Sequence, residues 1–460
     1  MDKTTLSTIN KAHFIGIGGI SMSGLAQILH CGGVKVTGSD ISESELISHL
    51  RSKGIKISIG HSGGNVEADS SLVIYTAAVR EDNPEIAAAK AHNIKLIDRA
   101  ELLGMIMGAY KYSIGVSGTH GKTTTTSLIS SILLEAGYDP TLNVGGIFKG
   151  IGSNFRIGAS EYFVAEACEY FDSFSKFYPF AGVILNIDHD HTDYFKNMEQ
   201  LSGSFRKFAC NVSKGGLLVI NAQIAEVEKI TEGLECIAAT YGKGGDYTAA
   251  NIVFAADGRP SFDVYYKGEL KTAGVALNLT GHHNIENSLA AFAVADHLGV
   301  AAADIKKAMG EFSGAKRRFE FKGEWKGVKI IDDYAHHPTE IDATLSAAKK
   351  CEHRKMYAAF QPHTFSRTKA FMDRFAASLA AADVVVLVDI YSAREADDGS
   401  IHSGDIAKKV AALGTEAHYF DSFDGAASFL KASCVPGDMI ITMGAGNINN
   451  LGEDMLSWQK

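Results

Sequence analysis

The chain has 460 residues, of which 46% are hydrophobic and 21% are charged, and its formal net charge is −9 at pH 7. This length suggests roughly three domains of about 150 residues each, with enough apolar residues for a sizeable core. The acidic balance argues against a nucleic acid or a membrane surface as a partner, because both attract proteins with an excess of positive charge. An anionic substrate would need locally clustered Lys and Arg side chains.

Cysteine usage and the absence of long apolar runs bear on the compartment. Six cysteines, at positions 31, 168, 210, 236, 351 and 434, show no Cys-x-x-Cys pair and no metal-ligand spacing. Cysteines spaced in this way are typical of proteins whose thiols stay reduced. The N-terminal residues lack the charged and apolar regions of a signal peptide, and no apolar run approaches the ~20 residues that a membrane helix needs. We therefore expect a cytoplasmic protein, monomeric or homodimeric.

The first block of the chain is expected to contain a strand over 12–17, a glycine-rich loop over 18–24, a helix, and a strand over 34–37. Gly16 and Gly18, with Asp40 after the second strand, resemble a dinucleotide-binding fingerprint. Ser21 stands where the third glycine of that fingerprint would be. A helix N-terminus here would suit the diphosphate of a nucleotide sugar as well as that of NAD. NAD would also require a hydride-transfer site, for which the sequence offers no candidate.

The second block opens with an apolar strand and a glycine-rich phosphate loop, Tyr112-Ser-Ile-Gly-Val-Ser-Gly-Thr-His-Gly-Lys-Thr-Thr-Thr-Thr126. Its glycines let backbone amides approach a polyphosphate, Lys122 adds a positive charge, and Thr123 and Thr124 offer hydroxyls to a phosphate or Mg²⁺. Apolar residues at helical spacing follow, and Gly137 is a candidate C-cap. The strict consensus would place a glycine at Val116, so this is a variant of the motif. It predicts that the protein binds a nucleoside triphosphate.

Two acidic clusters follow strands in the second block. The strand over 162–165 leads to Glu166 and Glu169, and the strand over 182–187 leads to Asp188-His-Asp-His-Thr-Asp193. Carboxylates and a histidine near a triphosphate are suited to Mg²⁺. The pattern His-x-His-x-Asp within 189–193 also matches part of a zinc-hydrolase motif, although Tyr194 stands where a further histidine would be needed.

Polar motifs continue into the third block. Asn284 and Asn287, three residues apart on one helix, could read a purine edge or could merely cap the helix. The basic turn Lys316-Arg-Arg318 stands at a domain junction. Strands are expected over 328–331, 356–360, 384–388 and 439–442. The first leads into Asp332-Asp-Tyr-Ala-His-His-Pro-Thr-Glu340 and the second into Gln361-Pro-His-Thr-Phe-Ser-Arg367, runs too polar for a core.

Three motifs together resemble the Mur ligase family of ATP-dependent amide-forming enzymes. They are Gly118-Thr-His-Gly-Lys-Thr-Thr124, Gly281-x-His-Asn284-x-x-Asn287 and Asp333-Tyr-Ala-His336-x-Pro338. The resemblance spans nearly the whole chain, with the motifs in order. It implies an α/β protein of three domains: a Rossmann-like UDP-sugar-binding domain over 1–110, a central P-loop ATPase-like domain with a mostly parallel sheet over 111–314, and a Rossmann-like domain over 315–460 that carries the amino acid and closes on ATP.

The resemblance also implies substrates and a reaction. The lactyl carboxylate of UDP-N-acetylmuramic acid would attack the γ-phosphorus of ATP, and the amine of L-alanine would displace phosphate from the resulting acyl phosphate. Charge repulsion between the anions makes Mg²⁺ a necessary cofactor. Within the family, the segments 316–319, 332–340 and 361–367 and the N-terminal loop resemble the branch that adds L-alanine. The branch that attaches a ready-made tripeptide to the same sugar shares the N-terminal and phosphate loops, and it differs at the strand that ends in Phe360-Gln-Pro-His363.

Site residues carry over from the family motifs by position. UDP-sugar contacts are expected from Gly18, Gly19, Ser21 and Asp40. ATP contacts are expected from Gly118, Thr119, His120, Gly121, Lys122, Thr123, Thr124, Asn287, Arg318 and Asp333. Mg²⁺ ligands are expected to be Thr123, Glu166 and His191, and catalytic roles fall to Lys122, Glu166, His191, Arg318 and His336. L-Alanine contacts are expected from Tyr334, His363 and Arg367.

Some features depart from the family pattern or leave alternatives open. The segment Ser204-Phe-Arg-Lys207 does not identify the carbamylated lysine that several relatives use, and Thr364 stands where some relatives have an arginine. Tyr391-Ser-Ala-Arg-Glu395 is expected to line the acceptor pocket. An NAD oxidoreductase, a catalytically silent UDP-sugar-binding regulator and a plain P-loop NTPase remain alternative interpretations.

Overall fold

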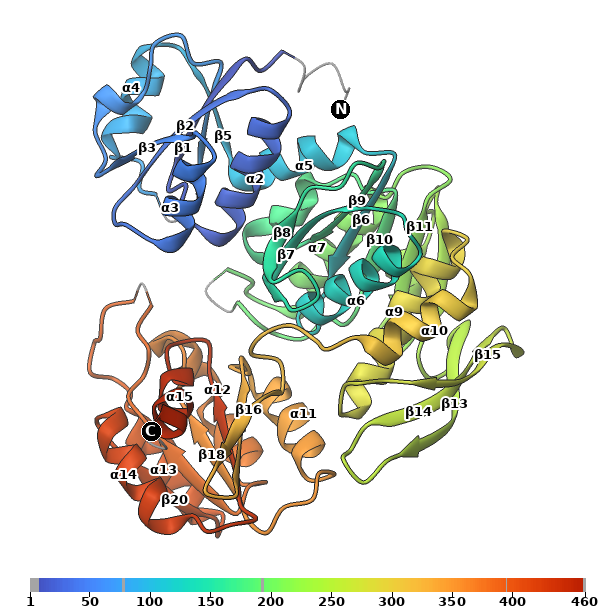
Figure 1. Cartoon of the computed structure of the whole chain (residues 1–460), viewed down its shortest axis with the longest axis vertical. Helices are drawn as coiled ribbons and strands as arrows, with labels where there is room; N and C mark the ends of the chain where they lie inside the picture. The colour runs from blue at the N-terminus through green and yellow to red at the C-terminus, as the bar shows by residue number, and fades with distance from the viewer. Residues whose placement is uncertain (1–7, 77–78, 192–193, 394, 458–460) are drawn as a thin grey trace. The chain divides into compact units, whose positions relative to one another are not determined.

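The computed structural model describes residues 8–76, 79–191, 194–393 and 395–457. The chain forms two compact units, and Figure 1 shows its helices and strands coloured in chain order. The first contains residues 1–187, 201–247 and 290–305, and the second contains residues 188–200, 248–289 and 306–460. Each unit is described by itself. No helix among the described residues is long and apolar enough to cross a membrane.

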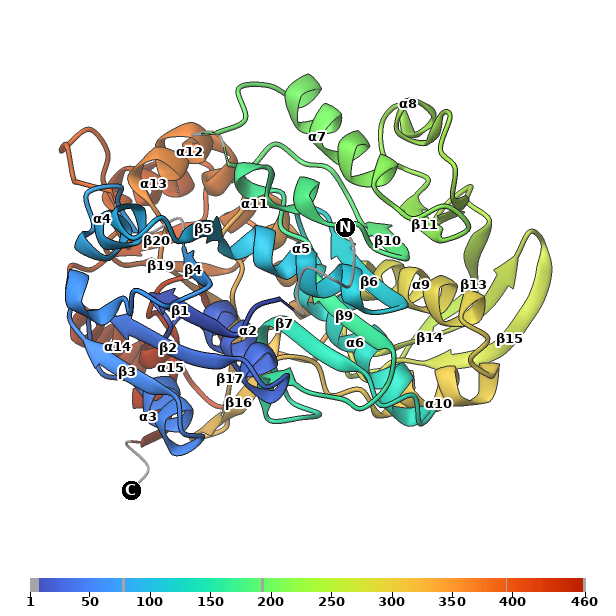
Figure 2. The same cartoon turned by 90° about the horizontal axis from the view of Figure 1, so that it is seen from above.

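The N-terminal part of the first unit is a parallel sheet with strand order β3-β2-β1-β4-β5 (Figure 2). Its strands are β1 (Lys11–Ile15), β2 (Lys35–Asp40), β3 (Lys56–Ile59), β4 (Leu72–Tyr75) and β5 (Lys95–Asp98). Its α-helices are α2 (Ile20–Cys31), α3 (Glu45–Ser52), α4 (Pro84–Ala91) and α5 (Arg99–Ala109). The strand order reverses between β1 and β4, and in sheets of this kind ligands bind beyond the carboxyl ends of the strands at that point.

The remainder of the first unit is built on a second, mostly parallel sheet with the order β12-β11-β10-β6-β9-β7-β8. Only β7 and β8 pair antiparallel within this set. The strands are β6 (Tyr112–Ser117), β7 (Thr141–Phe148), β8 (Ser153–Arg156), β9 (Tyr162–Glu166), β10 (Ala181–Ile184), β11 (Leu217–Asn221) and β12 (Ile237–Tyr241). The helices here are η2 (Tyr170–Lys176), α6 (Lys122–Glu135) and α8 (Val227–Thr231).

Four elements run from one unit into the other along the chain. They are α7 (Met198–Cys210), β13 (Tyr247–Phe254), α9 (His282–His297) and α10 (Ala302–Glu311). In the second unit, β14 (Pro260–Tyr266) and β15 (Glu269–Ala276) form an antiparallel pair.

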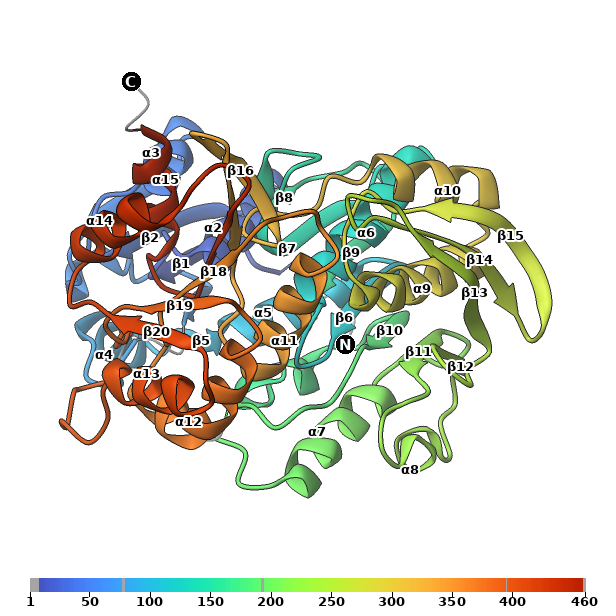
Figure 3. The same cartoon turned by 90° about the horizontal axis from the view of Figure 1, so that it is seen from below.

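The third sheet, in the second unit, has the order β16-β17-β21-β18-β19-β20 and helices on both faces (Figure 3). Its strands are β16 (Glu320–Trp325), β17 (Val328–Asp333), β18 (Met356–Phe360), β19 (Val384–Leu387), β20 (Glu416–Tyr419) and β21 (Met439–Met443). Its helices are α11 (Pro338–Ala348), α12 (Phe365–Leu379), α13 (Ser403–Ala412), α14 (Phe423–Ser433) and α15 (Asn449–Ser457).

Alternation along the strands explains the two helical layers of this sheet. Ala358 and Phe360 of β18 pack in a cluster with α11, α12 and α13, whereas Tyr357 and Ala359 pack in a cluster with α14 and α15. Successive side chains of a strand point to opposite faces, so a strand that is apolar throughout is buried on both faces. The three-layer α/β architecture predicted for this block is confirmed.

The main difference from the predicted elements is the start of α2. A glycine-rich loop was expected over 18–24, but the helix begins at Ile20, although Ser21, Ser23 and Gly24 are weak helix formers. Burial of Met22 and Leu25 outweighs this weak propensity. Gly24 also allows close packing, because a Cβ there would lie 3.0 Å from Cδ2 of Phe155.

Candidate functional site

The phosphate loop lies between β6 and α6, where the sequence motif predicts it. Gly118 and Gly121 have φ angles of +135° and +83°, which favour glycine, and α6 begins directly after Gly121. The predicted end of α6 also holds: Tyr138 N–H donates to Leu133 O at 2.9 Å, across Gly137, which has φ +74°. The loop therefore leads to a helix N-terminus, as anion binding requires.

Asn186, after β10, braces this loop from the neighbouring strand. Its Oδ1 accepts a hydrogen bond from His120 N–H at 2.7 Å, its Nδ2 donates to His120 O at 3.0 Å, and its backbone O accepts from Thr119 N–H at 3.2 Å. Sequence reasoning placed Asn186 inside a strand and gave it no role. The parallel pairing of β10 with β6 explains how a residue 66 positions away reaches the loop.

Lys122 folds back onto its own loop and pairs with Glu169. Its Nζ lies 3.0 Å from Glu169 Oε2 and 3.1 Å from Thr119 O, and it also donates to Gly118 O. The Glu169 side chain is 1% exposed. Despite burial, the negative charge of Glu169 raises the pKa of Lys122, so the lysine stays charged. The sequence pattern singled out Glu169 as acidic but did not predict this pairing.

Two glycines of β7 lie beside predicted metal ligands: Gly145 beside Glu166, at the end of β9, and Gly146 beside Thr123. Gly145 N–H donates to Glu166 Oε1 at 2.6 Å, and a Cβ on Gly145 would lie 2.4 Å from Glu166 Oε2. A Cβ on Gly146 would lie 3.3 Å from Cγ2 of Thr123. The glycine pair therefore leaves room beside two predicted metal ligands.

A pocket of about 820 Å³ opens at the switch point of the first sheet. Three predicted UDP-sugar residues, Gly18, Gly19 and Asp40, line it. Asp40 Oδ2 accepts a hydrogen bond from Gly18 N–H at 2.8 Å, which holds the loop after β1 to the end of β2. Gly19 is the N-cap of α2, so the helix N-terminus reaches the pocket. The fourth predicted residue, Ser21, does not line it and accepts a hydrogen bond from Arg99 Nη1 at 3.1 Å.

Sequence reasoning missed two further residues of the pocket lining, His61 and Arg80. Arg80 follows β4, the strand on the far side of the switch point, and offers a guanidinium to an anionic ligand. The position of Arg80 shortly after the fourth strand could have indicated an anion site, but Arg80 belongs to no recognised motif.

In the second unit, Asp333 organises the turn that contains Arg318. Its carboxylate accepts from Ala335 N–H and Phe319 N–H, both at 2.8 Å. Burial raises the pKa of Asp333 to about 6. The Arg318 guanidinium lies over the ring of Tyr334, 5.2 Å from its centroid.

Arg317, the neighbour of Arg318 in the basic turn, is held by an ion pair and by hydrogen bonds within the protein. Its Nε lies 3.0 Å from Asp332 Oδ2, and its Nη atoms donate to Gly446 O and Gly444 O at 2.9 and 2.7 Å. It therefore joins β17 to the loop after β21.

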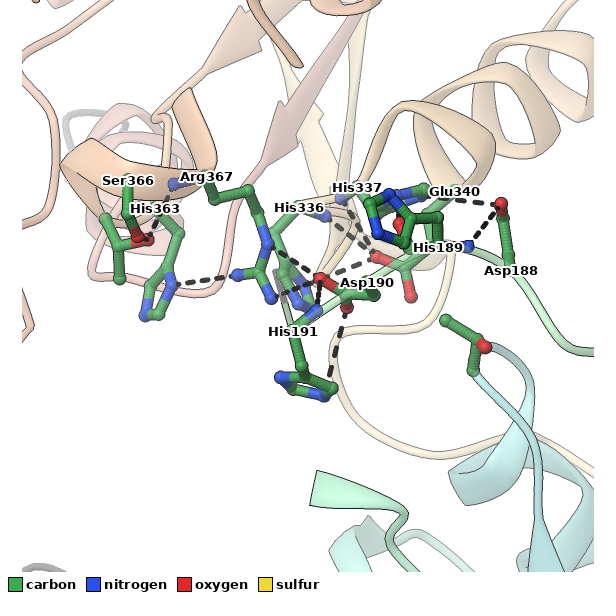
Figure 4. Close-up of polar contacts among 12 residues, drawn as sticks. Asp188, His189, Asp190, His191, His336, His337, Glu340, His363, Ser366 and Arg367 are labelled. Atoms are coloured by element: carbon green, nitrogen blue, oxygen red, sulfur yellow. Dashed lines mark hydrogen bonds and ion pairs between the residues drawn. The ribbon is translucent and has the colours of Figure 1, made fainter. Parts of the chain in front are cut away.

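Two of the predicted L-alanine residues, His363 and Arg367, lie beside His336 and Asp190 (Figure 4). Arg367 donates to Asp190 Oδ1 from Nε and Nη2 at 3.1 and 2.8 Å, and its Nη1 lies 3.3 Å from His363 Nδ1. The charge of Arg367 holds the pKa of Asp190 well below its usual range, although burial opposes this. Desolvation lowers the pKa of His363 to about 4, so this ring is neutral near pH 7.

His336 is the predicted catalytic residue nearest to this pair. Its Nδ1 lies 2.9 Å from Tyr334 O and 3.3 Å from Glu340 Oε2, and its ring contacts those of Tyr334 and His363. Burial lowers the pKa of His336. The carbonyl acceptor indicates that Nδ1 carries the ring proton and that Nε2 has the lone pair.

The loop 188–191 is held against α11 and α12 by these contacts. Asp188 Oδ2 accepts from Thr339 Oγ1 at 2.5 Å, and His337 Nε2 donates to His189 O at 3.3 Å (Figure 4). His191, a predicted metal ligand, has φ +51° and follows Asp190 in this loop. Asp193 of the zinc-hydrolase pattern, and Arg394 of the 391–395 motif, lie outside the described residues.

Thr364, which replaces an arginine of some relatives, has an unusual backbone of φ +65° and ψ 145°. Its N–H donates to Tyr391 O at 2.9 Å, its O accepts from Thr368 Oγ1 at 2.6 Å, and its side chain caps α12 at Arg367 N–H. Strain of this kind concentrates at functional sites. Because Thr364 caps α12, it fixes the start of the helix whose first turn carries Arg367.

Asn284 and Asn287 share one face of α9, as the spacing predicts. Asn287 Nδ2 donates to Asn284 Oδ1 at 3.1 Å, and Asn284 Nδ2 donates to Thr280 O at 2.7 Å. Lys207, in the segment where the sequence did not identify a metal-bridging lysine, is exposed.

Comparison with known proteins identifies the family. Residues 11–111 match the catalytic domain model of the Mur ligase family, residues 116–295 the Mur ligase middle domain, and residues 317–446 the Mur ligase glutamate ligase domain. The chain belongs to the Mur ligase family, as the resemblance predicted.

Relatives that match nearly the full length of the chain include the following proteins. The UDP-N-acetylmuramate–L-alanine ligase of Agathobacter rectalis is 51% identical over 96% of this chain and 97% of its own. That of Caldanaerobacter subterraneus subsp. tengcongensis is 49% identical over 99% of both chains. The crystal structure of the UDP-N-acetylmuramate–alanine ligase of Thermotoga maritima superposes with a TM-score of 0.81 at 31% identity, covering 98% of this chain and 99% of that one.

Proposed function

We propose that this protein is an ATP- and Mg²⁺-dependent ligase that joins L-alanine to the lactyl carboxylate of UDP-N-acetylmuramic acid in the synthesis of peptidoglycan precursors. The observation that carries the proposal is identity of about half of all residues, over nearly full length, with relatives named for this reaction. We further propose segments 1–110, 111–314 and 315–460 as its UDP-sugar, ATP and amino-acid domains. We also propose a cytoplasmic location, because nucleotide substrates of this kind are cytoplasmic metabolites, and a monomeric or homodimeric state.

The pocket of the first sheet is the proposed UDP-sugar site. Its N-terminal helix end and Arg80 provide positive potential for the diphosphate, and Asp40 is close enough to the loop to orient it. Its volume of about 820 Å³ is in the range of sites for small-molecule ligands. Ser21, which accepts a hydrogen bond from Arg99, stays a proposed UDP-sugar contact although it does not line the pocket.

The loop between β6 and α6 is the proposed site of the ATP phosphates. Backbone amides of residues 118–121 and of the first turn of α6 would bind the phosphate oxygens, and Lys122 would exchange part of its contact with Glu169 for a phosphate. Thr119, His120 and Thr124 belong to the same loop and turn. Asn287 and Arg318 are proposed adenine and phosphate contacts, and Asp333 supports Arg318 by holding the turn over 317–319.

Thr123, Glu166 and His191 are the proposed Mg²⁺ ligands. Carboxylate and hydroxyl oxygens are the hard ligands that Mg²⁺ requires, and the two glycines of β7 leave room beside Glu166 and Thr123. When bound, Mg²⁺ supplies charge neutralisation at the phosphates.

The reaction would proceed in two steps. A lactyl carboxylate oxygen bonds to the γ-phosphorus, the bond from that phosphorus to ADP breaks, and an acyl phosphate forms. The amine of L-alanine then bonds to the carbonyl carbon, and phosphate leaves with the C–O bond electrons. Lys122 and Arg318 would stabilise the charge on the transferred group.

The acceptor side would involve three residues. The neutral ring of His336 has a lone pair on Nε2 that could take the proton released by the alanine ammonium. Arg367 would bind the alanine carboxylate, with His363 and Tyr334 beside it, once Asp190 is released.

Phosphate release by the purified protein tests the proposal. ATP, Mg²⁺ and UDP-N-acetylmuramic acid are supplied with L-alanine, glycine, L-serine or the tripeptide L-Ala-γ-D-Glu-meso-diaminopimelate in separate reactions. We expect sugar-dependent release that is fastest with L-alanine, and a product heavier by one alanyl residue. Activity with the tripeptide alone would assign the protein to the tripeptide-attaching branch, and release without the sugar would indicate a plain NTPase.

A further inference from the structure

A buried carboxylate, Glu85, lies beneath the pocket of the first sheet. It is in the first turn of α4, and its side chain is 0% exposed. Its Oε1 accepts from Asn65 Nδ2 at 2.6 Å and from Ser62 N–H at 3.2 Å. Its Oε2 accepts from Ser39 Oγ at 2.5 Å and lies 3.3 Å from His13 Nε2. None of the residues predicted from the sequence for UDP-sugar binding belongs to this network.

The number of available protons determines the direction of these hydrogen bonds. Donors on both oxygens hold the pKa of Glu85 at about 2, against the effect of burial, so the group is an ionised acceptor. Ser39 has a single hydroxyl proton, and its bond to Glu85 uses it. Ser39 Oγ also lies 3.0 Å from His61 Nδ1. Because the hydroxyl has no second proton, His61 Nδ1 must be the donor in this contact.

His61 connects this network to the pocket. It lines the pocket, and 19% of its side chain is exposed. A neutral imidazole with the proton on Nδ1 has its lone pair on Nε2. That tautomer can accept a hydrogen bond from a ligand but cannot donate one from Nε2.

We propose that Ser39 and Glu85 are positioning residues that hold His61 in the Nδ1–H tautomer, so that Nε2 accepts a hydrogen bond from an N–H or O–H donor of the nucleoside. The inference rests on the proposed UDP-sugar function of this pocket. A uridine nucleotide offers donors of two kinds, the imide N3–H of uracil and the two ribose hydroxyls. Cytosine has an acceptor at N3, so a neutral His61 at the base would disfavour a cytidine nucleotide.

Nitrogen NMR of the ligand-free protein tests the tautomer directly. With ¹⁵N-labelled histidine, the His61 signals are assigned by their loss in His61→Gln, since the chain has 17 histidines. We expect the Nδ1–H pattern in the native chain and a shift toward the Nε2–H pattern in Ser39→Ala. The matched control is Thr37→Val, which removes another buried hydroxyl from β2, one that contacts His13 Nδ1 at 2.8 Å and not His61. A native His61 with its proton on Nε2 would overturn the proposal.

Calorimetric titration with UDP, CDP and 2′-deoxy-UDP tests the ligand contact. We expect Ser39→Ala to weaken UDP binding by about ten-fold, the loss typical of one hydrogen bond, while Thr37→Val does not. A reduced preference for UDP over CDP would identify the uracil N3–H as the donor, and a reduced preference for UDP over 2′-deoxy-UDP would identify the ribose. Equal weakening for all three nucleotides with an unchanged tautomer would overturn the positioning role. Failure of the native protein to bind UDP would overturn the proposed function of the pocket, a result separate from the NMR readout.

Discussion

Lys122 combines a role proposed in phosphate binding with a buried ion pair, so its replacement has two consequences. Lys122→Ala removes the cation of the phosphate loop and leaves Glu169 buried without it. We expect turnover to fall by about 10²-fold or more, while UDP affinity stays unchanged. Phosphate release measures the first and calorimetry the second.

The double variant Lys122→Ala/Glu169→Gln separates the two effects. Glutamine removes the buried negative charge that has lost its Lys122 partner, so this variant should recover stability relative to Lys122→Ala but should not recover turnover. Urea unfolding reports stability. Recovery of turnover would show that Lys122 serves only to neutralise Glu169.

Arg367 is already paired with a carboxylate, which affects its proposed role as the alanine clamp. Asp190 must be displaced before another carboxylate can form the same two hydrogen bonds. Arg367→Ala should therefore raise the KM for L-alanine, whereas Asp190→Asn should lower it by weakening the competitor. Initial rates at varied L-alanine give both values. A change confined to the KM for ATP would show that Arg367 contacts ATP and not L-alanine.

The lowered pKa of Glu85 should make the free energy of unfolding depend on pH in the acid range. Its folded-state pKa of about 2 is below the ordinary value of 4.5, so its contribution is complete above that ordinary value and is lost as pH falls toward 2. The difference corresponds to about 3 kcal/mol of unfolding free energy. Urea unfolding at several pH values should show a smaller acid-induced loss for Glu85→Gln than for the native chain. Parallel curves would contradict the assignment.

At the scale of elements, the position of the Glu166 carboxylate beside β7 depends on the missing side chain of Gly145. A Cβ on Gly145 would lie 2.4 Å from the Glu166 carboxylate, the mobile end of that side chain. We expect Gly145→Ala to displace the carboxylate and raise the Mg²⁺ concentration needed for activity, with little loss of stability. Gly203→Ala in α7 is the matched control, because its Cβ would have no heavy atom within 4 Å. If both variants need the same Mg²⁺ concentration for activity, Glu166 is not a ligand of the proposed metal site.

Most elements could be predicted because their signals are local. The strand and helix around the phosphate loop follow from an apolar run, helical spacing and Gly137, and β18 has the predicted bounds of 356–360. The start of α2 could not be predicted, because packing against Phe155 and the core, which lie far along the chain, outweighs local propensity there. The edge strands β16 and β20 were missed because they lack continuous apolar runs.

At the scale of the whole molecule, we expect two thermal unfolding transitions, because each of the two compact units can unfold cooperatively by itself. The UDP pocket lies within the first unit. UDP at 100 times its Kd should therefore stabilise that unit by about 2.7 kcal/mol and raise only one of the two transition temperatures. Differential scanning calorimetry with and without UDP checks this. A single transition that moves as a whole would show that the units unfold together.

The sequence by itself was sufficient for the family, the class of fold and the positions of the phosphate loop and the polar motifs after strands. These depend on short-range spacing, which survives in a linear string of residues. Only the tertiary structure decided the partners: Glu169 for Lys122, Asp190 for Arg367, and Ser39 with Glu85 for His61. Each of these contacts joins residues that different strands or helices bring together. Hydrogen bonds and ion pairs at such separations depend on how elements pair and pack, and no local pattern encodes them.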